Sequence, residues 1–268
     1  MAEHPKSTSK RRGLRAVSGF LFTAFLITSL FSYHIYRLTS FEMVEKIGTT
    51  TISSMNEVQS LFKLYYSELV ELAEQSPEAD LVLPGFDIQL GVKLKDIKGI
   101  SEDEFGNFIV RSLLKRIYYE GFSNVIKPSD LAGVDKENLR GLNDVADGFV
   151  NKKFNDFIFL VFIVSTVLAA LFALPFFIFS SGWNRPAGFG TGFVVAGIPA
   201  LLLLYTRSKI EGLVSSDDVA AGMLRGAILP FVDNAASNYF IVLLLGVGLL
   251  LVSASGIFIT KRRKSKAL

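Results

Sequence analysis

The chain has 268 residues, 50% of them hydrophobic, and its mean hydropathy of +0.41 excludes an ordinary soluble domain of this length. Its net charge of +3 reflects 28 basic and 25 acidic residues, and the basic excess lies at the two chain ends. That placement suits the flanks of membrane spans and argues against a nucleic-acid-binding protein. The chain contains no cysteine, which excludes disulfide bonds and a thiol nucleophile.

Four long apolar stretches predict four transmembrane helices, at residues 17–37, 156–180, 188–206 and 238–260. Each is close to the roughly 20 apolar residues that cross the hydrocarbon core of a bilayer as a helix. The first stretch follows a basic segment, as in a signal peptide, but its exit at 31–37 lacks the small residues that a signal peptidase needs. We therefore expect an uncleaved first span in an all-α membrane protein that is embedded in the lipid bilayer.

The distribution of charge predicts the topology. Lys and Arg mark the cytoplasmic flanks of membrane spans, and they dominate residues 1–16 and 261–268, which we interpret as cytoplasmic basic tails. Both termini are then cytoplasmic, residues 181–187 form a cytoplasmic turn, and residues 38–155 and 207–237 lie outside. The lack of cysteine and of any Asn-X-Ser/Thr glycosylation site favours the plasma membrane of a prokaryote.

Residues 38–155 are expected to form a mainly helical extracytoplasmic domain. Apolar residues recur every three to four positions over 52–72, which predicts an amphipathic helix that ends before Pro77. Residues 78–85 have the composition of a loop. Apolar and polar residues alternate over 86–95, which predicts a strand for which the chain offers no obvious partner.

Helix-capping residues predict the next helix of this domain. Ser101 is a favourable N-cap, and Glu104 three residues later completes a capping box. The helix is expected to continue to about Tyr119 and to stop at Gly121. A last helix, over residues 136–153, is expected to lead into the second span.

Residues 207–237 are expected to form a smaller helical lobe, with a helix capped by Ser215 and Asp218. The start of this helix is similar to the start of the helix at Ser101. The similarity fits an internal duplication, as found in transporters, but any capped amphipathic helix would show the same spacing, and both interpretations stay open. The aligned pairs are Ser101 with Ser215, Asp103 with Asp217 and Arg111 with Arg225.

Small residues and prolines predict how the spans pack. A Gly-x-x-x-Gly spacing lets two membrane helices approach closely, and glycines in the fourth span would let the third approach it. Prolines kink helices, although proline is common in membrane helices for packing reasons alone. The expected packing residues are Gly188, Gly192, Gly197, Gly246 and Gly248, and the expected kinks lie at Pro175 and Pro199.

Ionisable residues inside a membrane usually mark function, and the four predicted cores contain none. The nearest candidates are His34, at the outer end of the first span, and Asp156, at the outer mouth of the second. A histidine beside a carboxylate can relay protons or bind a metal, but a metal site needs more ligands, and an interfacial histidine most simply anchors its helix. We expect no catalytic, cofactor-binding or metal-binding residue, and no enzyme.

These features favour a non-enzymatic membrane protein that serves as an interaction, assembly or accessory subunit. Its extracytoplasmic domain would contact a membrane or extracytoplasmic protein, or a second copy in a homo-oligomer. The alternative is a component of a transporter or channel, lined by the kinked second and third spans, whose polar residues are only Ser and Thr. A further alternative is an extracytoplasmic sensor, which would need an output domain that the short tails do not supply.

Overall fold

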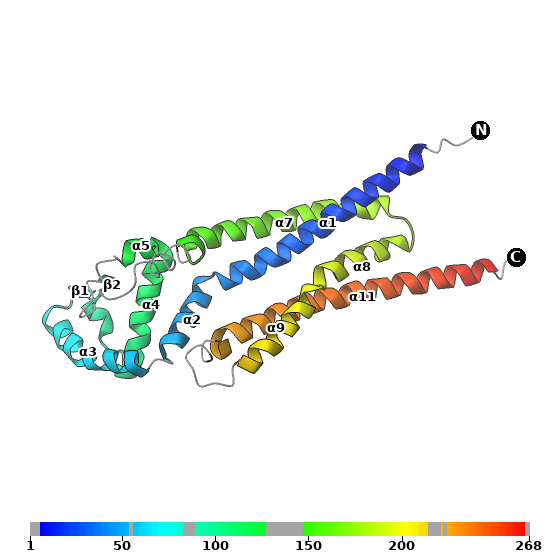
Figure 1. Cartoon of the computed structure of the whole chain (residues 1–268). Helices are drawn as coiled ribbons and strands as arrows, with labels where there is room; N and C mark the ends of the chain where they lie inside the picture. The colour runs from blue at the N-terminus through cyan, green and yellow to red at the C-terminus, as the bar shows by residue number, and fades with distance from the viewer. Residues whose placement is uncertain are drawn as a thin grey trace. The chain divides into compact units, whose positions relative to one another are not determined.

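The computed structural model describes residues 6–53, 56–82, 89–126, 147–213, 221 and 224–265. The chain divides into two compact units. What we name the membrane unit comprises Met1–Ile35, Ile158–Lys209 and Phe231–Leu268, and the polar unit comprises Tyr36–Phe157 and Ile210–Pro230. Figure 1 shows the helices and strands of both units in chain order from blue to red.

Long helices build the membrane unit, because in hydrocarbon every backbone N–H and C=O must find its partner inside the protein. In the described part of the chain, four helical stretches are long and apolar enough to cross a membrane, which confirms the prediction of a multi-pass membrane protein. They are Lys10–Leu38, Asp147–Phe179, Asn184–Gly212 and Leu224–Arg263. The helices within them are α1 (Lys6–Leu38), α7 (Lys152–Phe179), α8 (Asn184–Gly197), α9 (Pro199–Leu213) and α11 (Leu229–Ser265).

The helices continue past the predicted spans into polar sequence. Hydropathy marks only the apolar part of a helix, whereas backbone hydrogen bonding continues until the sequence stops it. Arg207 on α9 and Asp233 on α11, both outside the predicted spans, therefore lie on helices. Their side chains form an ion pair, with 2.8 Å between the guanidinium Nε and the carboxylate.

α1 and α7 are antiparallel neighbours in the membrane unit. As residue numbers increase along α1, the numbers of the contacting residues on α7 decrease, as expected for antiparallel helices. The ring pairs have centroid separations between 5.6 and 6.1 Å, and a hydroxyl pair at 2.7 Å lies between them. The pairs are Phe22 with Phe176, Phe25 with Phe172, Ser29 with Thr166 and Tyr33 with Phe162.

α8 and α11 cross with their backbones in contact. A Cβ atom added at Gly190 would lie 2.9 Å from the carbonyl oxygen of Gly246, and one added at Gly246 would lie 2.6 Å from the backbone nitrogen of Val194. Farther along, a Cβ at Gly197 would lie 2.7 Å from the Cα of Leu243. Since backbone cannot move aside as a side chain can, this crossing requires glycine.

The other predicted packing glycines lie elsewhere. A Cβ at Gly188 would meet the Phe176 ring at 2.5 Å, and one at Gly192 would meet the Thr23 hydroxyl at 2.9 Å, so both face side chains of α7 and α1. At Gly248 a Cβ would meet no atom within 4 Å, so the structure gives no packing reason for glycine there.

The two prolines have different consequences. Pro175 lies inside α7, which continues through it. Pro199 begins α9, and Ile198 separates it from the end of α8 at Gly197. Since proline has no N–H to donate to the preceding turn, the third span is divided into two helices at this point, and Figure 1 shows the chain change direction there.

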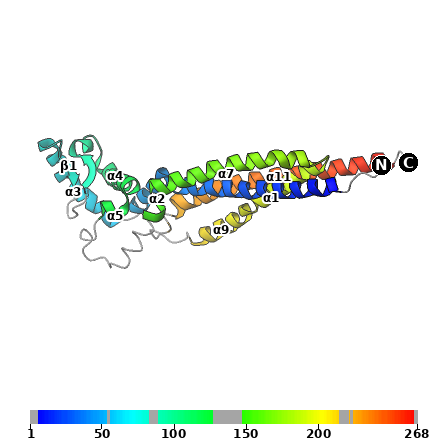
Figure 2. The ribbon, with the colours of Figure 1, turned by 90° about the horizontal axis from the view of Figure 1, so that it is seen from above.

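The start of α1, the end of α11 and the turn between α7 and α8 all lie toward the same end of the membrane unit (Figures 1 and 2). Trp183 of the turn is fixed to α11. Its indole nitrogen donates to Thr260 at 3.2 Å, and Ser253 donates to its carbonyl at 2.6 Å. A chain with four spans places its first residues, its last residues and the connection between its second and third spans on one side, as seen here.

The polar unit contains α2 (Phe41–Ser53), α3 (Asn56–Gln75), α4 (Glu102–Glu120) and the short α5 (Phe122–Val125). The single amphipathic helix predicted from Ile52 onward corresponds mainly to α3, which ends before Pro77 as expected. The predicted helix over 136–153 lies largely outside the described residues. In the smaller segment, Gly226 of η3 (Leu224–Ile228), a turn of π-helix, packs on Thr50 of α2.

The polar unit also holds a small sheet, which corrects the all-α prediction. β1 (Asp80–Val82) and β2 (Gln89–Lys93) are antiparallel, with Asp80 opposite Lys93 and Val82 opposite Gln89. Residues 78–85 were expected to form a loop, and the strand at 86–95 had no obvious partner within the chain, whereas the structure pairs it with β1. β1 is only three residues long, with Leu81 alone buried, so alternation could not reveal it.

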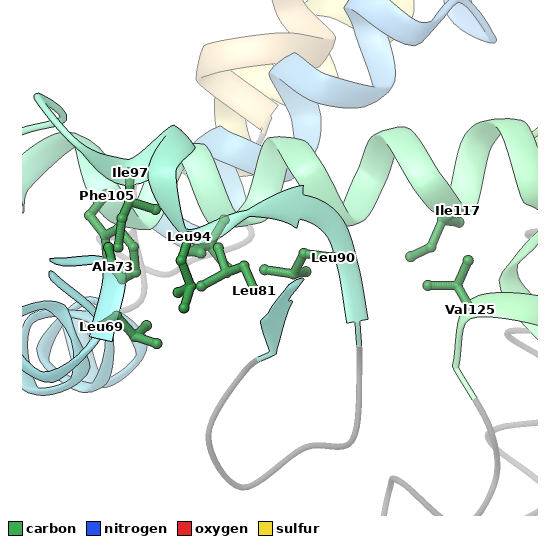
Figure 3. Close-up of a cluster of buried hydrophobic side chains, with 10 residues drawn as sticks. Leu69, Ala73, Leu81, Leu90, Leu94, Ile97, Phe105, Ile117 and Val125 are labelled. Atoms are coloured by element: carbon green, nitrogen blue, oxygen red, sulfur yellow. The ribbon is translucent and has the colours of Figure 1, made fainter. Parts of the chain in front are cut away.

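Apolar side chains from α3, both strands, η1 (Leu94–Ile97), α4 and α5 form one core in the polar unit (Figure 3). Leu81 and Leu90 come from the two strands and are almost fully buried. With the helical residues they close the core without a disulfide, as is feasible for a unit of this size. Its buried members are Leu69, Ala73, Leu81, Leu90, Leu94, Ile97, Phe105, Ile109, Ile117 and Val125.

Tyr118, near the end of α4, is buried against aromatic rings. Its ring centroid lies 5.6 Å from that of Phe41 and 5.3 Å from that of Tyr119. Burial, with smaller contributions from neighbouring groups, raises the pKa of Tyr118 to about 12. The folded polar unit therefore favours the neutral form of the Tyr118 phenol over its ionised form.

Substitution of Gly246, which touches the backbone of α8, should destabilise the membrane unit. Gly246→Leu should lower the free energy of unfolding by about 1–3 kcal/mol, since the new side chain would overlap Val194. Thermal unfolding in detergent, followed by circular dichroism, measures the effect. The matched control is Gly248→Leu, which places the same side chain in open space two residues away. Equal melting temperatures for the two variants would contradict the crossing.

Stability of the polar unit should fall between about pH 10, the ordinary pKa of tyrosine, and about pH 12. The unfolded state loses the Tyr118 proton first in this window, so the loss of stability grows with pH, up to about 2 kcal/mol. Tyr118→Phe should remove this part of the pH dependence, measured by thermal unfolding across the range. Tyr119→Phe, at an exposed ring, should keep it, and parallel curves for all three proteins would refute the assignment.

Candidate functional site

The acidic and histidine side chains of the described residues do not converge. No group of three or more His, Cys, Asp or Glu in that part of the chain could hold a metal ion. A protein metal site needs several such ligands around one point.

His34 lies in the membrane unit and is surrounded by aromatic rings. Its ring centroid is 5.0 Å from Tyr239, 5.2 Å from Tyr33 and 6.4 Å from Phe231. The side chain is buried, and its Nε2 has no hydrogen-bond partner among the described residues. These rings hold the imidazole in place, an arrangement that suits an anchor of α1.

Asp156 belongs to the polar unit and has a partner there. Its carboxylate accepts a hydrogen bond from Lys152, one turn earlier on α7, at 2.6 Å. The ion pair stabilises the exposed first turns of that helix. A site shared by His34 and Asp156 stays a prediction.

Ser101 is the N-cap of α4, with its hydroxyl accepting from the Glu104 amide at 3.3 Å. The Ser101 hydroxyl also lies 3.1 Å from the Glu104 carboxylate. Gly121 ends the helix with a φ of 95°, which favours glycine. The second predicted cap, at Ser215 and Asp218, lies outside the described residues, and the internal duplication therefore stays a hypothesis.

Ion pairs hold two of the acidic residues of the polar unit, Asp103 and Glu120, in structural roles. A hydrogen bond from Lys63 at 2.7 Å lowers the pKa of Asp103 and links α3 to α4. The Arg116 guanidinium donates a hydrogen bond to the Glu120 carboxylate at 2.5 Å, and this bond likewise lowers the pKa of Glu120. Both carboxylates are therefore ionised near neutral pH and poorly suited to act as general acids.

The exposed face of α3 carries three leucines. The exposed fractions of Leu61, Leu64 and Leu72 are 38%, 69% and 41%. At roughly 100° per residue, these three and Glu68 fall within about 80° of the helix circumference. We name this stripe the α3 leucine face.

The opposite side of α3 is held by the core, where Leu69 and Ala73 are buried. The helix therefore cannot turn its leucine face inward without exposing that core. Leu61 and Leu64 do not belong to the apolar stripe predicted for this helix. Their position outside it was the feature of the sequence that could have indicated an exposed apolar face. Leu72 was expected on the buried stripe and is instead partly exposed.

Carboxylates border the α3 leucine face. Glu68, Glu71 and Glu74 are all exposed on the same helix, and the one nearby cation of α3, Lys63, pairs with Asp103. An apolar stripe beside negative charge is complementary to a partner with apolar and basic side chains.

Comparison of the chain with protein-family models, with curated proteins and with solved structures finds no match, so the geometry of its own residues carries the functional argument.

Proposed function

We propose that this is a non-enzymatic membrane protein that serves as an interaction or assembly subunit, with the polar unit outside the cytoplasmic membrane. The α3 leucine face is the observation that carries the proposal. Apolar side chains gathered on one exposed helical face are typical of a surface that another protein covers. The outward placement rests on the basic residues at the two chain ends.

The proposed mode of binding is helix against helix. Leu61 and Leu64 are three residues apart, and Leu72 lies eight residues, or two helical steps of four, beyond Leu64. The three leucines thus share the face with which an amphipathic helix presents anchors to a groove or to a second helix. The rigid attachment of α3 to its core means that little conformational freedom is lost when the face is covered. The surrounding glutamates would select a partner with basic residues and speed the encounter.

A second candidate is a transporter or channel component, which two observations in the membrane unit favour. Pro199 divides the third span, and divided helices often line a pathway. His34 is buried with its Nε2 unpartnered among the described residues. Under this alternative, liposomes containing the protein should show a proton or ion flux that His34→Phe abolishes. Absence of flux from wild-type liposomes would exclude it.

Removal of the leucine face should release a bound partner. The variant Leu61→Ser/Leu64→Ser/Leu72→Ser should reduce recovery of a near-stoichiometric partner by about tenfold or more, because buried apolar anchors dominate binding energy. The measurement is mild-detergent purification of the tagged chain from cells that naturally express it, with quantitative mass spectrometry.

The matched control removes three other exposed apolar side chains of the polar unit, in Val82→Ser/Tyr119→Ser/Phe149→Ser. This variant should retain the partner at the wild-type level. Equal retention by the leucine variant, or a wild-type chain that is recovered alone, would contradict the proposed function.

A further inference from the structure

The membrane unit has an open groove between α1 and the α7–α8 pair, with a volume of about 530 Å³. It lies toward the start of α1, at the end of the unit where the α7–α8 turn also lies (Figure 1). Arg12 and Arg15 line it at one end, and Phe20, Thr23 and Val195 line it farther along. The volume is within the range of pockets that hold small ligands.

Glycines let the helices that form this groove pack closely. A Cβ at Gly19 would lie 2.7 Å from the Phe176 ring, one at Gly188 would lie 2.5 Å from the same ring, and one at Gly192 would meet Thr23. These three glycines therefore let α1, α7 and α8 approach one another closely along the wall of the groove. The hydroxyls of Thr23 and Thr191 already donate to carbonyls of their own helices, at 3.0 and 2.9 Å, so the wall presents mainly apolar surface.

Among the described residues of their unit, the two arginines of the groove have no carboxylate to pair with. Over residues 6–35, 158–209 and 231–265, Asp233 is the single acidic residue, and it forms the ion pair with Arg207. Neither guanidinium group forms an ion pair or a hydrogen bond with a residue that the structure describes. Arg12 and Arg15 thus lie three residues apart on α1 and line the groove with no acidic partner among the described residues.

We propose that this groove binds an anionic phospholipid of the surrounding bilayer. The phosphate lies between Arg12 and Arg15, and an acyl chain follows the apolar groove past Gly19 and Val195. Guanidinium donors match phosphate oxygens in geometry and charge, and basic pockets between membrane helices suit acidic lipid headgroups. The arginines lie at the polar end of α1 and the apolar lining follows toward its middle, in the order in which a phospholipid presents headgroup and chain.

The proposal is tested on the detergent-solubilised full chain by native mass spectrometry, titrated with phosphatidylglycerol and with phosphatidylcholine of the same acyl chains. The wild type should bind one phosphatidylglycerol on the order of tenfold more tightly than phosphatidylcholine. Arg12→Gln/Arg15→Gln should lose most of that preference. Inorganic phosphate at millimolar concentration should not displace the lipid, because the acyl chain contributes to binding.

A charge-matched control separates the groove from general surface attraction. Arg262→Gln/Arg263→Gln removes the same charge from exposed positions near the end of α11, outside the groove, and should keep the preference. Ala16→Phe, at an exposed groove residue, should weaken the binding of both lipids at this site. Equal losses in the two arginine variants, a wild type without preference, or displacement by phosphate alone would overturn the proposal.

Discussion

The helices of the membrane unit present large apolar side chains on their outer surface, as suits contact with the hydrocarbon of a bilayer. Side chains such as Phe20, Leu174 and Leu251 are more than half exposed on the membrane unit, and water would make such surfaces unstable. In lipid the same exposure costs little, but every backbone polar group must then be satisfied within its own helix. The sequence meets this condition with long helices and with a single acidic residue over the described part of the unit.

Within that constraint, small residues decide which helices meet. Lipid is as apolar as the helix surfaces, so association depends on close packing rather than on burial. The glycines at the crossing of α8 and α11 allow backbone contact, while those facing α1 and α7 leave room for the side chains of Thr23 and Phe176. The polar unit is held differently, by an apolar core that closes around Leu81, Leu90 and Phe105.

Much of this architecture could be predicted from the sequence, because hydropathy and capping are local signals. Four spans, the cap at Ser101 and the stop at Gly121 all follow from short segments. β1 could not be predicted, since a three-residue strand shows no period, and its pairing with β2 depends on distant contacts. The sequence also could not distinguish Gly246, which touches backbone, from Gly248, which touches nothing, because the facing helix decides that difference.

The topology is tested most directly by the accessibility of single cysteines, since the chain has none of its own. Variants Lys10→Cys, Ser67→Cys and Ser265→Cys would be treated with a membrane-impermeant maleimide on intact cells and after permeabilisation. Ser67→Cys in the polar unit should be labelled on intact cells, and both terminal variants should be labelled only after permeabilisation. Labelling of either terminal variant on intact cells, or protection of Ser67→Cys, would contradict a four-span chain with an outward polar unit.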